Sequence, residues 1–136
     1  MSYDNPNRQE YVAHAQDIGA GAKTFTFYGP KGKDGWVYDY GVVNVTEAFT
    51  ADTLPCYVSV GLSGNVDAYG EELSMATTAI GGGKTLRSTY STPGDLDDYI
   101  VAKIPADTAV LVTATAPTGG TPAGIGDIRV VIDWAD

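Results

Sequence analysis

The stretch Asp127-Ile-Arg-Val-Val-Ile-Asp-Trp134 decides the fold class. Every second residue in it is apolar: Ile128, Val130, Ile132 and Trp134. A period of two is that of a β-strand that buries one face and exposes the other. The chain therefore contains at least one strand that needs a second apolar layer to pack against.

Working outward from this stretch, similar runs recur toward the N-terminus. We expect strands over residues 24–28, 36–46, 56–62, 85–90, 99–104 and 107–116, while residues 71–80 fit either a short helix or a strand. Segments rich in Gly and Pro separate them, at 29–35, 81–83, 93–98 and 117–126. Seven or eight short strands without a strong helix predict an all-β chain, with a single β-sandwich or jelly-roll-like domain over residues 23–136.

Residues 1–22 differ from this pattern. They are polar and end in Ile18-Gly-Ala-Gly-Ala22, a composition typical of a flexible segment. We expect a polar N-terminal arm over 1–22, with a short helix over 9–16 as the alternative. Deletion of such an arm would leave the domain folded.

Composition excludes several function classes. The chain has 136 residues, which favours one domain, and a net charge of −9 from 8 basic and 17 acidic residues. One Cys and one His leave no internal disulfide and disfavour a cysteine zinc site, a His-rich metal site or a Ser-His-Asp triad. The acidic balance argues against nucleic-acid binding. We expect no enzyme activity, no cofactor and no metal.

The first ten residues lack the basic and apolar regions of a secretory signal, and no run is long enough to span a membrane. We therefore expect assembly in a reducing cytoplasm and no membrane partner. Cys56 reads as a buried structural residue.

Three short motifs suggest chemistry, and each has a plainer interpretation. Gly82-Gly-Lys84-Thr85 is similar to the end of a phosphate-binding loop, but Thr78 stands where the motif needs its first glycine. The acidic run 95–98 lacks the spacing of a calcium loop. Glu71 and Glu72 read as a surface charge pair.

Aromatic residues are the stronger signal, with nine Tyr and two Trp. Strict alternation puts Trp36, Tyr38 and Tyr40 on one side of one strand, and Gly41 is a candidate for a bulge in it. That side is a core face, a subunit contact or a platform for sugar stacking. The candidate partner-binding residues are Tyr3, Tyr11, His14, Trp36, Tyr38 and Tyr40.

The run Ile104-Pro-Ala-Asp-Thr-Ala-Val-Leu-Val-Thr113, the closing strand 127–134 and a small acidic chain rich in Gly, Ala and Thr resemble the capsid decoration (cement) proteins of tailed bacteriophages. The resemblance implies a structural virion protein, often a trimer, that binds the major capsid protein on the outer surface of the assembled head. Its arm would reach across neighbouring capsid subunits. Two alternatives stay open: a carbohydrate-binding or host-adhesion β-sandwich, and a small hydrolase with two carboxylates.

Overall fold

The computed structural model describes residues 7–76 and 78–135. Within them lie eight strands: β1 (Arg8–Asp17), β2 (Lys23–Phe27), β3 (Gly35–Thr50), β4 (Tyr57–Leu62), β5 (Asn65–Ser74), β6 (Lys84–Thr85), β7 (Val110–Ala114) and β8 (Ala123–Trp134). The helical elements are short: the 3-10 turn η1 (Ile18–Ala20), α1 (Leu86–Thr89) and α2 (Pro93–Tyr99). None of these described helices has the length and apolarity needed to cross a membrane.

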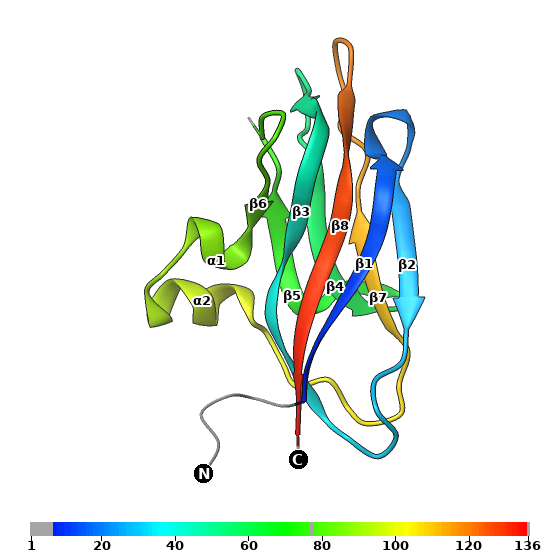
Figure 1. Ribbon diagram of the computed structural model, residues 1–136, viewed down its shortest axis with the longest axis vertical. Helices are drawn as coiled ribbons and strands as arrows, with labels where there is room; N and C mark the ends of the chain where they lie inside the picture. The colour runs from blue at the N-terminus through cyan, green and yellow to red at the C-terminus, as the bar shows by residue number, and fades with distance from the viewer. Residues whose placement is uncertain (1–6, 77, 136) are drawn as a thin grey trace.

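The strands form two four-stranded antiparallel sheets that face each other (Figure 1). The first sheet has the order β1-β8-β3-β6 and the second has the order β2-β7-β4-β5. The pairs β1·β8, β2·β7, β3·β6 and β4·β5 are those of one long antiparallel hairpin that has been rolled up. This is the connectivity of a jelly roll, and it confirms the predicted all-β sandwich.

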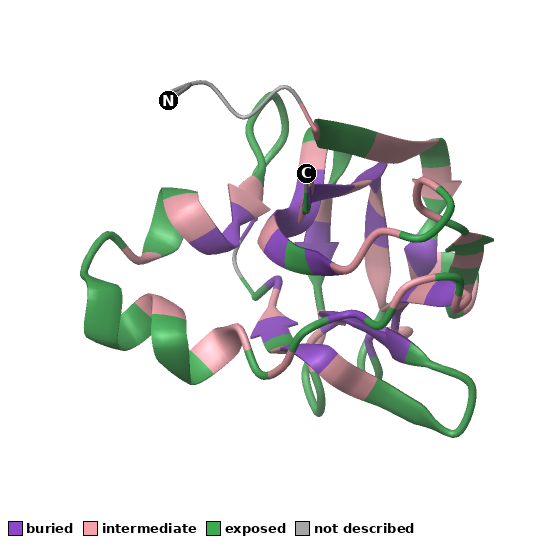
Figure 2. Ribbon diagram, turned by 90° about the horizontal axis from the view of Figure 1, so that it is seen from below, coloured by how far each residue is buried: buried purple, intermediate pink, exposed green. Residues whose placement is uncertain are grey.

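The core lies between the sheets, where Figure 2 shows the buried segments. Alternating residues of β8 supply much of it, and Ile128, Val130 and Ile132 are fully buried, as the sequence pattern predicts. Trp134 closes the lower end against the turn that precedes β3. A Cβ at Gly29 would lie 2.2 Å from the Trp134 ring, so that only glycine fits there.

The predicted arm is wrong for residues 8–18. β1 pairs with β8 from Arg8 to Asp17, and Ile18 is fully buried in the core. The segment looked like a polar arm because its side chains alternate, with polar residues such as Glu10 facing outward and Tyr11 packing against the core. Deleting residues 1–22 would therefore remove a sheet strand. Residues 1–6 lie outside the described part of the chain.

The strand predicted over 85–90 is also wrong, because residues 86–89 form α1. The Thr85 side chain accepts a hydrogen bond from the Ser88 backbone N–H, and the Ser88 hydroxyl accepts one from the Thr85 N–H. This reciprocal cap favours a helix start over a strand. The predicted turn at 93–98 is α2, with Pro93 in its first turn after the N-cap Thr92.

The two sides of the sandwich differ. On one side, the connection that contains α1 and α2 lies beside β5 and β6 (Figure 1). The backbone N–H of Val101 donates to Tyr69, which covers part of the β5 edge. On the other side lie β1 and β2, and no described strand pairs with the outer edge of either.

Candidate functional site

The outer face of the first sheet carries two of the predicted residues, Trp36 and Tyr38, in accessible positions. The Trp36 side chain is 48% exposed, and Tyr38 is partly exposed. Trp36 lies opposite Asp133 of β8. These two aromatic residues are adjacent outward positions near the beginning of β3.

Tyr40 corrects the prediction, because it is fully buried and cannot contact a partner. The β3·β8 register shifts between Val37 and Asp39, so that Tyr38 is an extra residue in the strand. Such a bulge reverses which face the following residues occupy. Gly41, the predicted bulge, instead makes room for β6, since a Cβ there would lie 2.1 Å from the Lys84 carbonyl oxygen.

The ring of Tyr38 lies between two arginines. The Cζ atoms of Arg8 and Arg87 are 3.6 and 3.7 Å from its centroid. Two guanidinium groups cannot share one face at these distances, so they cover opposite faces of the ring. Each contact is a cation–π interaction, and a sugar cannot stack on a ring that is covered on both sides.

Further bonds fix both arginines. Arg8 donates to Asp133 through Nε at 2.6 Å and through Nη2 at 3.1 Å, a two-point contact from β1 to β8. Arg87 donates through Nε to the Tyr38 carbonyl at 2.6 Å. The stacked guanidinium groups are therefore held before any partner binds.

Arg129 lies on the same side of the sheet. It pairs with Glu10, and its Nη1 lies 3.4 Å from Asp39 Oδ2. Asp39 also accepts from the Arg87 backbone N–H at 2.9 Å, which joins α1 to the sheet. We call the following set the arginine–aromatic face: Arg8, Trp36, Tyr38, Arg87 and Arg129.

All three arginines of the sequence lie in this face. Their partners are three carboxylates, those of Glu10, Asp39 and Asp133. The face is thus electrically balanced in a chain whose net charge is −9. Arg, Trp and Tyr are the residue types that dominate the energetic centres of protein interfaces.

The arginines were missed because they are far apart in the sequence. Arg8 and Arg129 do have a signal, since both occupy polar positions in alternating segments that end up paired. Arg87 has none, because it reaches Tyr38 from a helix that the sequence pattern does not predict.

Tyr11 and His14 have other surroundings. The Tyr11 ring stacks on Phe27 with centroids 3.8 Å apart, and its hydroxyl accepts from Trp134 Nε1 at 3.1 Å. Burial raises the pKa of Tyr11. The structure thus gives Tyr11 a role in packing. The His14 side chain is 77% exposed, and a contact with a partner stays a prediction. Tyr3 lies outside the described residues.

Asp127 of β8 contacts the bulges of the two strands that pair with β8, namely β1 and β3. It accepts from the backbone N–H of Ala15 at 2.8 Å and from Asn44 Nδ2 at 2.9 Å, and His14 Nδ1 lies 3.2 Å away. Ala15 and Asn44 both have positive φ, at 52° and 50°. The hydrogen bond from Asn44, followed by that from Ala15, lowers the pKa of Asp127. This carboxylate therefore stabilises the positive-φ conformations of Ala15 in β1 and Asn44 in β3.

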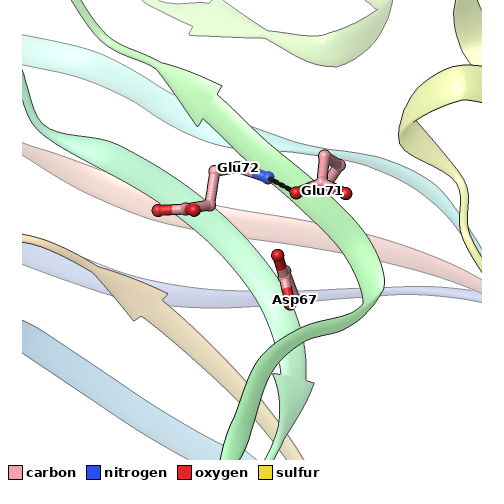
Figure 3. Close-up of side chains that lie close together, drawn as sticks. All are labelled: Asp67, Glu71 and Glu72. Carbon is pink, nitrogen blue, oxygen red and sulfur yellow. Dashed lines mark hydrogen bonds between the residues drawn. The ribbon is translucent and has the colours of Figure 1, made fainter.

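Three acids gather on β5, namely Asp67, Glu71 and Glu72, with ligand atoms within 4.8 Å of one another (Figure 3). A hydrogen bond with Asp67 raises the pKa of Glu71. Such groups are common on acidic surfaces without a metal ion. Neither of the clefts described next is lined by these acids, so we assign no chemical role to them.

Two of the clefts in the described part of the chain lie beside residues that the sequence analysis names. One, of about 300 Å³, has a mostly apolar lining that includes Phe49, Cys56 and Met75. Burial raises the pKa of the Cys56 thiol to about 12, which leaves it a neutral packing group, as predicted. The other, of about 420 Å³, lies beside Gly82 and Lys84. Lys84 begins a two-residue strand, which is not the strand–loop–helix arrangement of a phosphate-binding loop.

Comparisons with protein families, curated proteins and solved structures gave no match. The class that the fold and site define is a jelly-roll domain with one balanced, ordered arginine–aromatic face. The function is therefore inferred from that face and from the residue pattern.

Proposed function

We propose that this protein is a structural virion protein that docks on the outer surface of an assembled phage head and stabilises the major-capsid lattice. The observation that carries the docking role is the arginine–aromatic face, which gathers Trp36, Tyr38 and every arginine of the chain. The identity of the partner rests on the resemblance to decoration proteins.

The order of the face supports tight docking. Interfaces lose affinity when long side chains must be immobilised on binding. Here the stacking on Tyr38 and the ion pair with Asp133 already restrict Arg8. A half-exposed Trp36 beside it offers a large area with few rotatable bonds.

The charge distribution fits the same role. The balanced face needs no strongly basic partner, whereas the acidic remainder of the chain keeps the free protein soluble and repels DNA phosphates. A protein that binds only the assembled shell stabilises it by its binding free energy, multiplied over many copies.

Heads that lack the protein, from the virus that encodes the chain, provide the test. Added protein should co-sediment with the heads, saturate at a fixed number of copies per head and raise the temperature at which the heads rupture. A failure to co-sediment, or binding that never saturates, would contradict the proposal.

A carbohydrate-binding role is the second candidate, and the exposure of Trp36 favours it. The predicted platform has lost two of its three rings, because Tyr38 is covered on both sides and Tyr40 is buried. Glycan-array binding that disappears in Trp36→Ala would support this role over head binding.

A further inference from the structure

The open edge of β1 is a second surface for contacts. It offers backbone N–H and C=O groups, whereas the arginine–aromatic face offers side chains. β1 lies at the end of the first sheet, and among residues 7–76 and 78–135 its only strand neighbour is β8 (Figure 1). An unpaired strand edge presents N–H and C=O groups that a further strand can use.

One backbone hydrogen bond shows which backbone groups of β1 face that edge. The Trp134 N–H donates to the Asn7 carbonyl at 3.3 Å, and the neighbouring pair is Arg8 with Asp133. Hydrogen-bonded pairs alternate along an antiparallel ladder, so Gln9 and Tyr11 also bond to β8. The backbone groups of the intervening residues, Arg8, Glu10 and Val12, therefore point to the open edge.

The bulge in β1 limits the usable length. The β1·β8 register shifts between Ala13 and Gln16, and Ala15 has a φ of 52°. The regular edge thus runs from Arg8 to Ala13. It contains no proline, and the charges of Arg8 and Glu10 lie on the outer face of the sheet, where they pair with Asp133 and Arg129.

We propose that β1 pairs antiparallel with β1 of a second copy of this chain, around a two-fold axis at Gln9. Only positions whose backbone groups point outward can bond to each other across the two copies. Since these positions alternate along β1, the two-fold axis must lie at a single residue rather than between two residues. An axis at Gln9 sets Arg8 opposite Glu10 of the second copy, twice. This register therefore has complementary charges at both of its hydrogen-bonded pairs.

Neighbouring registers are less favourable. An axis at Glu10 sets the two Glu10 side chains directly opposite each other, and like charges at such positions destabilise pairing. An axis at Tyr11 sets Arg8 opposite His14, which lies within the bulge. The charge pattern thus selects one register.

The assembly has a definite geometry. Side chains at directly opposite positions point to the same face of a sheet, so the two arginine–aromatic faces lie on one side of the extended sheet. If the proposed function holds, two docking faces on one particle increase its avidity for a lattice. A two-fold contact closes as a dimer, whereas the trimer implied by the resemblance needs a different contact.

Sedimentation equilibrium of the free protein tests this pairing without any head. We expect a reversible dimer at protein concentrations of up to about 1 mM. Glu10→Pro removes an N–H that points to the edge and none that bonds to β8, and it should raise the dimer dissociation constant at least about tenfold. Val12→Pro is the matched control, since its N–H also points outward but lies beyond the two Arg8–Glu10 pairs, and it should keep the dimer.

Thermal unfolding of each variant checks that the fold is kept. Should Glu10→Pro fail to fold, Glu10→Lys decides instead, because it sets Lys opposite Arg8 at both pairs and should abolish the dimer. A wild-type monomer or trimer over the whole range would overturn the proposal. An undiminished dimer in the folded Glu10 variant would also overturn it. A protein that dimerises but does not bind heads would contradict only the proposed function.

Discussion

Both sheets have four antiparallel strands, but the chemistry of their outer faces differs. The first sheet presents Trp36, Tyr38, Arg8 and Arg129, and Arg87 of α1 lies against the same face, joined by stacking and by ion pairs. The second sheet presents small hydroxyl and apolar side chains, including Thr24, Thr26, Leu111 and Thr113, and its edge strand β5 carries the acids Asp67, Glu71 and Glu72. The inward residues of both sheets are ordinary core residues. Function is therefore expected to lie in what differs, the outer face of the first sheet.

The largest effect is expected at Trp36. Trp36→Ala should weaken head binding roughly 30-fold or more, about 2 kcal/mol, because it removes the main exposed anchor of the face. Thr26→Ala on the second sheet is the control and should change binding less than about twofold. Co-sedimentation measures both, and equal losses in the two variants would remove the distinction between the faces.

Tyr38 tests whether the order of the arginines matters. Tyr38→Leu should weaken binding about tenfold, since two cation–π contacts of roughly 0.5–1 kcal/mol each are lost and both guanidinium groups lose their stacking partner. Tyr38→Phe keeps the ring and should stay within about twofold of the wild type. Similar losses in both variants would mean that the hydroxyl, rather than the stacking, is what binding requires.

Asp133 tests the balance of charge. Asp133→Asn leaves Arg8 without its carboxylate and gives the face a net positive charge, so binding should fall a few-fold, by about 1 kcal/mol or less. Binding by the variant should also depend on salt more strongly than wild-type binding does, because an unpaired surface charge is screened. A titration at low and high salt measures this, and identical salt dependence would count against the role of balance.

The smallest effect on docking is expected at Asp127, which lies away from Trp36 in the β8 ladder. Its pKa is lowered in the folded protein, so its contribution to stability is present above the ordinary carboxyl pKa of about 3.9 and is lost as the pH falls through the folded pKa. Asp127→Asn should therefore reduce the loss of stability below pH 4, with head binding unchanged at neutral pH. Chemical unfolding across this pH range measures the first effect.

Much of the fold could be predicted from the sequence, because alternation is a local signal. Ile128, Val130 and Ile132 are buried as expected, whereas of the Gly- and Pro-rich segments 93–98 lies in the helix α2 and 117–126 includes the beginning of β8. β1 was mistaken for an arm because its edge position leaves it half polar. The strand predicted over 85–90 is instead the helix α1, because a capping box at Thr85 and Ser88 outweighs strand propensity over a few residues.

The site was less predictable. The bulge at Tyr38 depends on the register with β8, which no short sequence window contains, and it buries Tyr40 while leaving Tyr38 outside. The stack of Arg8 and Arg87 on Tyr38 joins residues from three elements. Such a cluster is specified by the assembled sheet rather than by a motif.

Oxidative footprinting of the head-bound protein tests the central claim most directly, because it compares both faces in one sample. Trp36 reports on the first sheet, and Tyr57, an outward residue of β4, reports on the second. The account predicts that Trp36 becomes protected on binding while Tyr57 stays as reactive as in the free protein. Protection of Tyr57 with Trp36 unchanged would contradict it.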